Sequence, residues 1–150
     1  MNVIDQYKWR YATKIFDAKK KISDANIELI KDSISLAPTS YGLQLFKVII
    51  VEKKEIKDEL KKASFDQSQI SDASHIFVFF NSTKIVEDDI DNYIKNKAAI
   101  QNKTISEING YGDFLKDTLL KKEHRKISIW TANQVYIALS HLLTFCPSLS

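Results

Sequence analysis

The chain has 150 residues, of which 44% are hydrophobic and 27% are charged, and its formal net charge at pH 7 is +3. These values are ordinary for one globular domain with its own core. The lysines are scattered along the sequence, which argues against a nucleic-acid-binding groove. The longest apolar run, Ile76 to Phe80, is too short to cross a bilayer, so we expect no membrane contact.

Cysteine and histidine are scarce in this sequence. Cys146 is the single cysteine, which rules out an internal disulfide and fits a reducing compartment. The first twenty residues are charged throughout, unlike a secretory signal, so we expect a cytoplasmic protein. No histidine has a second ligand at metal-binding spacing, and we expect no metal site.

The first third of the chain predicts two helices and a polar loop. Apolar residues at helical spacing predict a short helix over 3–9, after which Arg10 leaves the helix. Ser23 and Asp24 are suitable N-terminal caps for a second amphipathic helix, which Pro38 should end. The residues from Pro38 to Gln44 are rich in small hydroxyl and amide side chains, which suits a loop that approaches another group closely.

Two strands follow, separated by a charged helix. The β-rich stretch 46–51 predicts a strand buried on both faces, and 75–80 predicts a second strand. The helix over 54–62 should turn Ile56 and Leu60 inward. This alternation of helix and strand indicates a sheet with helices packed on it.

The last part of the chain predicts helices over 87–100 and 106–120, and in the second the helical pattern is less clean because Gly110 and Gly112 break it. The final helix, 127–145, carries apolar residues around most of its circumference. Such a helix is typically central, and it also suits a subunit interface.

Arginine is rare in this chain and marks a candidate phosphate site. Of 22 basic residues only Arg10 and Arg125 are arginine. A guanidinium group can hold a phosphate through two parallel hydrogen bonds, which an ammonium group cannot. With Lys8 and Lys14 nearby, the turn after the first helix could bind phosphate, and Arg10, Ala12 and Lys14 would share one side. The alternative is a solvated basic turn, as most charge clusters are.

Four motifs in order resemble those of the FMN-dependent nitroreductase family, and together they cover about residues 3 to 143. They are Lys8-Trp9-Arg10-Tyr11-Ala12-Thr13-Lys14-Ile15-Phe16, Leu36-Ala37-Pro38-Thr39-Ser40-Tyr41-Gly42-Leu43-Gln44-Leu45-Phe46, Asp72-Ala73-Ser74-His75 before a strand, and Trp130-x-x-x-Gln134-x-Tyr136-Ile137-Ala138-Leu139.

The resemblance implies an α+β fold of the α/β/α layered, nitroreductase-like kind, with helices around a central, mostly antiparallel sheet. Residues 1–150 would form a single domain that is incomplete at its C-terminus, with the sheet truncated to about two strands. The residues from Cys146 to Ser150 do not resemble the family's continuation, so we expect a truncation or a shifted reading frame.

The resemblance also implies an oxidoreductase. Bound FMN would take a hydride from NADH or NADPH and pass electrons to a nitroaromatic or quinone-type acceptor in a ping-pong reaction. The flavin carries this chemistry, so no side chain is expected to be catalytic.

Site residues follow from the resemblance position by position. Arg10 would bind the FMN phosphate, Lys14 would lie against the pyrimidine edge of the flavin, and Tyr11 and Ala12 belong to the same turn. In family dimers the flavin lies at the subunit interface, so a second group of cofactor-binding residues would come from the opposite subunit of a homodimer: Pro38, Thr39, Ser40 and Gln44.

Two departures from the family pattern count against full activity. Asp66 stands where the family has a flavin-contacting asparagine, and an ionised aspartate cannot donate a hydrogen bond. Ala12 lacks the hydroxyl that a serine would offer to phosphate. Because the family's C-terminal part is missing, the alternative function is a truncated, non-catalytic, nitroreductase-like dimerisation module that cannot hold FMN.

The third motif has two interpretations. Asp72 and His75 could be catalytic, or Asp72 or Ser74 could bind backbone groups where the strand starts while His75 begins the strand. Side chains of this kind commonly close turns, which favours the second interpretation.

Overall fold

Two capped helices begin the chain in the computed structural model, which describes residues 2–149. Helix α1 (Val3–Trp9) follows Asn2, whose side chain accepts a hydrogen bond from the Asp5 N–H at 2.9 Å. Helix α2 (Asp24–Ser35) follows Ser23, whose hydroxyl accepts one from the Asn26 N–H at 3.3 Å. Both helices and the Ser23 cap agree with the sequence patterns.

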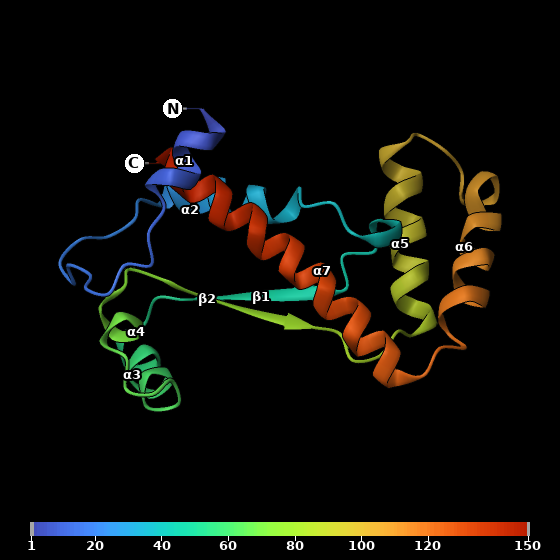
Figure 1. Cartoon of the computed structure of the whole chain (residues 1–150). Coiled ribbons are helices and arrows are strands. Elements are labelled where there is room, and N and C mark those ends of the chain that lie inside the picture. The colour runs from blue at the N-terminus through green and yellow to red at the C-terminus, as the bar shows by residue number, and fades with distance from the viewer. Residues whose placement is uncertain (1, 150) are drawn as a thin grey trace. The chain divides into compact units, whose positions relative to one another are not determined.

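The sheet consists of β1 (Phe46–Val51) and β2 (Ile76–Asn81), which run antiparallel (Figure 1). Within residues 2–149 it has these two strands, so the expected α+β fold with a two-stranded antiparallel sheet is confirmed. The prediction that 46–51 is buried on both faces is wrong. Lys47 and Ile49 are exposed and alternate with half-buried neighbours, as expected of a strand with only one covered face.

Two helices that pack on each other connect the strands: α3 (Lys54–Lys62) and α4 (Ser68–Asp72). The inward face of α3 differs from the prediction. Ile56 is 48% exposed, whereas the buried residue is Lys57, at 3%. Hydrophobic spacing misses this because a lysine can bury its methylene stem when its ammonium group finds an oxygen.

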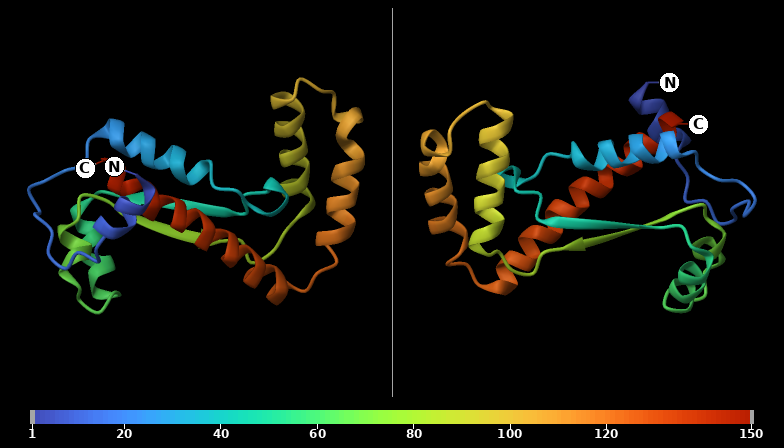
Figure 2. Two further views of the ribbon diagram at one scale, coloured as in Figure 1. Left: turned by 45° about the horizontal axis from the view of Figure 1, so that its top comes forward. Right: turned by 180° about the vertical axis from the view of Figure 1, so that it is seen from behind.

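Helices α5 (Glu87–Ile100) and α6 (Ile105–Leu119) form an antiparallel hairpin and lie side by side in both Figure 1 and Figure 2. Lys116 of α6 joins them through ion pairs to Asp91 at 2.8 Å and Glu87 at 3.7 Å of α5. The two glycines that weaken the helical pattern of the sequence do not interrupt α6, which is continuous. Leu43 and Leu45, which precede β1, pack into the core of this hairpin. The buried residues of this core are Leu43, Leu45, Ile90, Ile94, Ala98, Ile108, Leu115 and Leu119.

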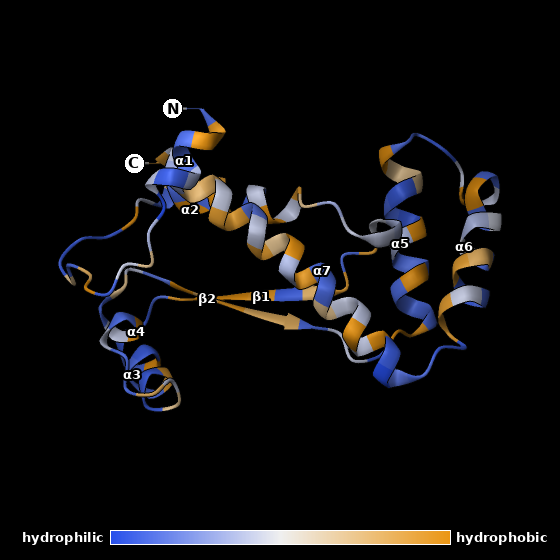
Figure 3. Ribbon diagram, viewed as in Figure 1, coloured by the Kyte–Doolittle hydropathy of each residue, from blue (hydrophilic) through white to orange (hydrophobic). Residues whose placement is uncertain are grey.

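The long helix α7 (His124–Phe145) is followed by the short 3₁₀ helix η2 (Cys146–Leu149). Apolar residues recur along α7, as Figure 3 shows, but only one stripe of it is buried. That stripe consists of Ile127, Thr131, Gln134, Ala138 and Leu142. Other large apolar side chains of α7 are exposed, among them Ile129, Tyr136 and Leu143.

The described residues form two units. One comprises residues 2–37, 48–79 and 136–149, and the other comprises Pro38–Lys47 and Phe80–Val135. In the first unit, Ile27, Ile30 and Ile34 on one face of α2 are buried. In the second unit, the core is formed around the α5–α6 hairpin. Among the described helices, none has the length and apolar character needed to cross a membrane.

Candidate functional site

The basic turn follows α1 directly and is exposed along its length. The Arg10 N–H donates to the Gln6 carbonyl at 3.0 Å and ends the helix there. The Thr13 N–H donates to the Tyr11 carbonyl at 3.0 Å, which bends the chain at Ala12. Among residues 2–149, no carboxylate lies within ion-pair distance of Arg10 or Lys14. Both cations are therefore available to an anionic ligand.

The loop of the second motif is ordered by its own backbone. The Gly42 N–H donates to the Thr39 carbonyl at 2.9 Å, and the Gln44 N–H donates to the Thr39 hydroxyl at 3.2 Å. Tyr41, Gly42 and Gln44 have φ values of 59°, 75° and 48°. Positive φ is uncommon for residues other than glycine and is often found at binding sites.

Gln134 of α7 anchors this loop. Its Oε1 accepts a hydrogen bond from the Ser40 N–H at 2.7 Å, and its Nε2 donates to the Trp130 carbonyl at 3.2 Å. The ring of Tyr41 lies 6.2 Å from that of Trp130. The second and fourth family motifs, which are far apart in the sequence, thus meet here. The α7 segment that contains the fourth motif supports the loop that contains the second motif. Sequence reasoning did not assign Gln134, although a polar amide within an apolar helical run was a usable signal.

A second polar cluster fixes the end of β2 to α7. The Asn81 Nδ2 donates to the Ser128 carbonyl at 3.0 Å and to the Thr131 hydroxyl at 3.1 Å. The Thr131 hydroxyl lies 2.5 Å from the Ser82 carbonyl and 2.9 Å from the Ile127 carbonyl, either of which can accept its single proton. These residues were also missed, because buried threonine on a helix has no distinctive sequence pattern.

Asp66 occupies the turn between α3 and α4 and is exposed. Phe65 and Asp66 have φ values of 54° and 51°, and the Asp66 N–H donates to the Lys61 carbonyl at 3.1 Å. This left-handed conformation favours asparagine and aspartate over other side chains. Either residue can therefore make the same turn, and they differ here in hydrogen-bonding capacity and in charge.

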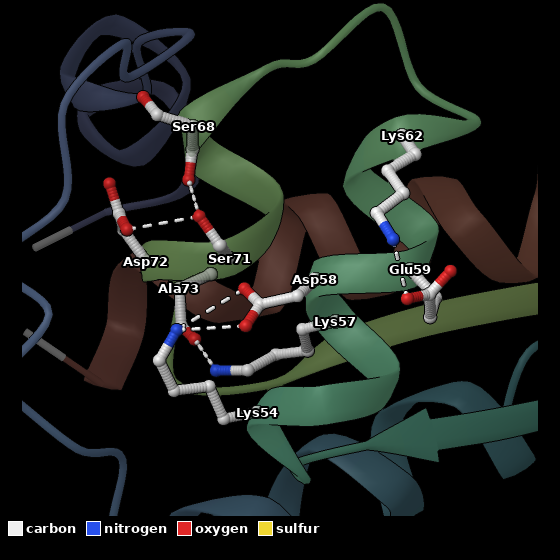
Figure 4. Close-up of polar contacts among 9 residues, drawn as sticks. All are labelled: Lys54, Lys57, Asp58, Glu59, Lys62, Ser68, Ser71, Asp72 and Ala73. Atoms are coloured by element: carbon white, nitrogen blue, oxygen red, sulfur yellow. Dashed lines mark hydrogen bonds and ion pairs between the residues drawn. The ribbon is translucent and has the colours of Figure 1, made fainter.

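Lys57 joins α3 to the end of α4. Its ammonium group donates to the Ala73 carbonyl at 2.6 Å, at the C-terminus of α4 (Figure 4). Burial lowers the pKa of Lys57 below its ordinary value, and the charges of Lys21 and Lys54 lower it further. Lys57 thus satisfies a carbonyl that the helix itself leaves without a donor. The ion pairs of Lys54 with Asp58 and of Lys62 with Glu59, also in Figure 4, are exposed.

Ser74 of the third motif makes the backbone contact that its turn chemistry favoured, whereas the strand begins at Ile76 and not at His75. The Ser74 hydroxyl accepts a hydrogen bond from the Ile22 N–H at 2.9 Å and lies 2.9 Å from the His75 Nδ1. The His75 Nε2 is 3.9 Å from a carboxylate oxygen of Glu52. Asp72 accepts a hydrogen bond from Ser71 at 3.1 Å. Ser74 therefore ties the segment before α2 to the start of β2.

The predicted site residues divide between the two units. Arg10, Tyr11, Ala12, Lys14 and Asp66 belong to the first unit, and Pro38, Thr39, Ser40 and Gln44 to the second. Within the second unit, a cavity of about 640 Å³ lies beside the loop, with Gly42, Gln44, Asn92, Asn96 and Lys97 among its lining residues. Lys97 also lies 4.1 Å from the centre of the Tyr111 ring.

Metal ligation and thiol chemistry gain no support from the described residues. No group of three or more histidine, cysteine, aspartate or glutamate residues within 2–149 could hold a metal ion. Cys146 is a free thiol, and burial raises its pKa, which disfavours the reactive thiolate.

Solved structures share this fold. A candidate nitroreductase from Exiguobacterium sibiricum, described in complex with FMN, superimposes with a TM-score of 0.82 at 18% identity, over 98% of this chain and 70% of that one. A candidate NAD(P)H:FMN oxidoreductase from Staphylococcus epidermidis gives a TM-score of 0.85 at 16% identity, over 97% and 69%.

Sequence comparison finds curated relatives along nearly the whole chain. A candidate NAD(P)H nitroreductase of Staphylococcus epidermidis is 31% identical over 146 residues, covering 95% of this chain and 66% of the relative. The candidate NAD(P)H nitroreductase YfkO of Bacillus subtilis is 30% identical over 149 residues, covering 95% and 67%. The chain therefore spans about two thirds of the length of these relatives.

The family profile described as the Nitroreductase family matches residues 7–149. This match includes all four motifs, and it agrees with the shared fold and the curated relatives. The chain belongs to the nitroreductase family.

Proposed function

We propose that this protein is an FMN-dependent oxidoreductase that uses NADH or NADPH to reduce nitroaromatic or quinone-type acceptors by a ping-pong reaction. The proposal is supported by the relatives described as NAD(P)H nitroreductases and by the neighbour described in complex with FMN. The observation that carries it in this chain is the exposed Arg10 guanidinium, which has no carboxylate partner among residues 2–149 and stands in the family's opening motif.

The residues present fit a flavin mononucleotide. Arg10 offers a bidentate grip on a phosphate, and Lys14 adds a second positive charge that favours an anionic ring edge. The loop of Pro38, Thr39, Ser40 and Gln44 offers small polar groups on a backbone held in a special conformation. FMN, when bound, supplies hydride acceptance and transfer, while these side chains bind and orient it and keep water away.

The site is proposed to be shared by two subunits of a cytoplasmic homodimer. In this arrangement Arg10, Tyr11, Ala12, Lys14 and Asp66 of one subunit face the loop of the other. Exposed apolar side chains on α7 support association, since Tyr136 is 70% exposed and Leu143, two turns further on, is 44% exposed. The free Cys146 suits a reducing compartment.

The first test is a visible absorption spectrum after the protein is mixed with FMN and separated from free flavin by gel filtration. We expect flavin absorbance to migrate with the protein at a dimer's volume, and NADH or NADPH to bleach it. A colourless protein peak would contradict the proposal and favour the non-catalytic dimerisation module.

A matched pair of variants tests the role of Arg10. Arg10→Lys keeps the charge but loses the planar fork, so FMN affinity should fall roughly tenfold, as the loss of a charged hydrogen bond predicts. Arg125→Lys alters the only other arginine, which is exposed at the start of α7, and should leave FMN affinity unchanged. Equal affinities for the two variants would show that the basic turn is only surface.

A further inference from the structure

We propose that Gln134 is a positioning residue for the flavin, because its side chain fixes the Ser40 turn in the conformation that presents the loop. This inference rests on the proposed function, since it assigns a task to a residue that does not itself face the ligand. It concerns only the second unit, which contains both the turn and this part of α7.

The Ser40 N–H needs a partner that the turn cannot provide. Ser40 begins the 3₁₀ helix η1 (Ser40–Gly42), and the first N–H groups of a helix have no acceptor within it. Thr39, which precedes it, provides no side-chain cap and instead accepts from the Gln44 N–H. The Gln134 Oε1, at 2.7 Å, takes the place of the missing cap.

Gln134 is itself held in place. It is only 7% exposed, and its Nε2 donates to the Trp130 carbonyl at 3.2 Å in the preceding turn of α7. Both ends of the amide are therefore used, which fixes the orientation that turns Oε1 toward Ser40. A shorter or apolar side chain would leave the Ser40 N–H partly buried without an acceptor.

The turn that Gln134 supports is in an unfavourable backbone conformation. Tyr41 and Gln44 have positive φ, which non-glycine residues maintain only where surrounding contacts determine it. At Gly42 a side chain would also be strained, since φ is +75° and an added Cβ would lie 3.2 Å from the Tyr93 hydroxyl oxygen. The Gln134 side chain of α7 bonds to this turn at Ser40, and the Trp130 ring of the same helix lies 6.2 Å from the ring of Tyr41.

The Ser40 hydroxyl is left free by this arrangement. Within residues 2–149 it has no hydrogen-bond partner, although the Ser40 N–H and carbonyl are both engaged. A hydroxyl held on an ordered backbone, without an internal partner, suits hydrogen bonding to a polar edge of a ligand. Gln134 would therefore act on the flavin through Ser40.

The experiment compares Gln134→Met, which keeps the side-chain volume, with Thr131→Val as a matched control. Thr131 lies one turn earlier on α7, is buried, and bonds to β2's end rather than to the loop. Hydrogen exchange at the Ser40 amide, FMN affinity by fluorescence quenching and Tm are measured for both. We expect Gln134→Met to speed Ser40 exchange and weaken FMN binding roughly tenfold. Thr131→Val should lower Tm while leaving Ser40 amide exchange and FMN affinity at wild-type values.

A third variant separates positioning from general stability. Gln134→Glu keeps the acceptor for the Ser40 N–H, but its ionised carboxylate cannot donate to the Trp130 carbonyl. When protonated, the new carboxyl group can do both, so FMN affinity should recover as the pH is lowered through its pKa. Recovery of binding with pH is not expected if Gln134 only fills space.

The outcomes distinguish this inference from the proposed function. If wild-type protein binds no FMN, the proposed function fails and the positioning role fails with it. If wild-type protein binds FMN but Gln134→Met binds it equally well, or Thr131→Val weakens it as much, only the positioning role is overturned. Unchanged exchange at Ser40 in Gln134→Met would overturn it as well.

Discussion

At position 66, aspartate and asparagine suit the same backbone conformation but offer different hydrogen-bonding groups to a ligand. The turn at Phe65 and Asp66 needs a left-handed conformation, which asparagine adopts at least as readily as aspartate. Its side chain is exposed and so is free to meet a ligand. Aspartate offers only acceptors, whereas asparagine adds an N–H donor.

We therefore predict that Asp66→Asn tightens FMN binding by roughly threefold to tenfold, the contribution of about one neutral hydrogen bond. The change should leave Tm almost unaltered, because the backbone conformation suits both residues. Fluorescence titration and a melting curve measure the two quantities. Unchanged or weaker binding would show that Asp66 does not face a flavin carbonyl.

Burying the charged Lys57 side chain lowers the free energy of unfolding, and the size of this effect depends on pH. Its pKa in the folded protein is lowered from 10.5, chiefly by burial. Between that lowered pKa and 10.5 the unfolded chain binds more protons than the folded one, so the contribution of Lys57 to stability rises with pH in this alkaline window. Below the folded pKa the cost of the charge is constant.

Lys57→Met removes the titrating ammonium group and leaves the Ala73 carbonyl without its hydrogen-bond donor. We predict that the difference in free energy of unfolding between wild type and Lys57→Met moves in favour of the wild type as the pH rises toward 10.5. Urea unfolding at several alkaline pH values measures it, and other titrating groups cancel because both proteins contain them. A difference that is constant with pH would contradict the assigned pKa direction.

At the scale of elements, α6 contains two glycines that sequence patterns treat alike and the structure separates. A Cβ added at Gly110 would meet nothing within 4 Å, whereas one at Gly112 would lie 3.1 Å from the Ile94 Cγ1 of α5. Gly110 therefore only costs helix propensity. Gly112 allows α5 and α6 to approach closely.

We predict that Gly110→Ala stabilises the protein by about 0.5 to 1 kcal/mol, because alanine loses less backbone entropy in a helix. Gly112→Ala should give a smaller gain or a loss, since Ile94 must move to admit the new methyl group. Chemical denaturation of the two variants provides the comparison. Equal stabilisation by both would mean that the α5–α6 contact yields without cost.

Helix α7 also shows which features of a helix sequence patterns do not predict. Its C-terminal end and its apolar character follow from sequence, although it begins at His124, before the predicted start at Ile127. The buried stripe includes Thr131 and Gln134 and omits Ile129 and Tyr136. Those two polar residues are buried because Ser82, Asn81 and Ser40 supply partners from other elements. Partners so far away in the sequence are invisible to any local pattern.

At the scale of the whole molecule, the exposed apolar face of α7 bears on the proposed dimer. Tyr136→Lys places a charge at the centre of that face, where burial against a second subunit would desolvate it. We predict at least a roughly tenfold increase in the dimer dissociation constant, measured by sedimentation velocity. Ile100→Lys, at another exposed apolar position on α5, is the control and should leave dimerisation unchanged.

Much of the fold could be predicted because its signals are local. The Ser23 cap, the helix over 87–100 and the strand after His75 depend on neighbours within a few residues. Lys57 was missed because its burial depends on the Ala73 carbonyl, sixteen residues later. The site residues came from the resemblance to a family and stay predictions, since local patterns do not place Arg10 against a ligand.

The bond between Ser40 and Gln134 has a consequence for synthesis on the ribosome. These residues are 94 positions apart, so the nascent loop has no anchor until α7 has been translated and released from the exit tunnel. At about 5 to 20 residues per second, this interval is roughly 5 to 20 s. The emerging chain can therefore form its first helices well before the loop around Ser40 is held in place.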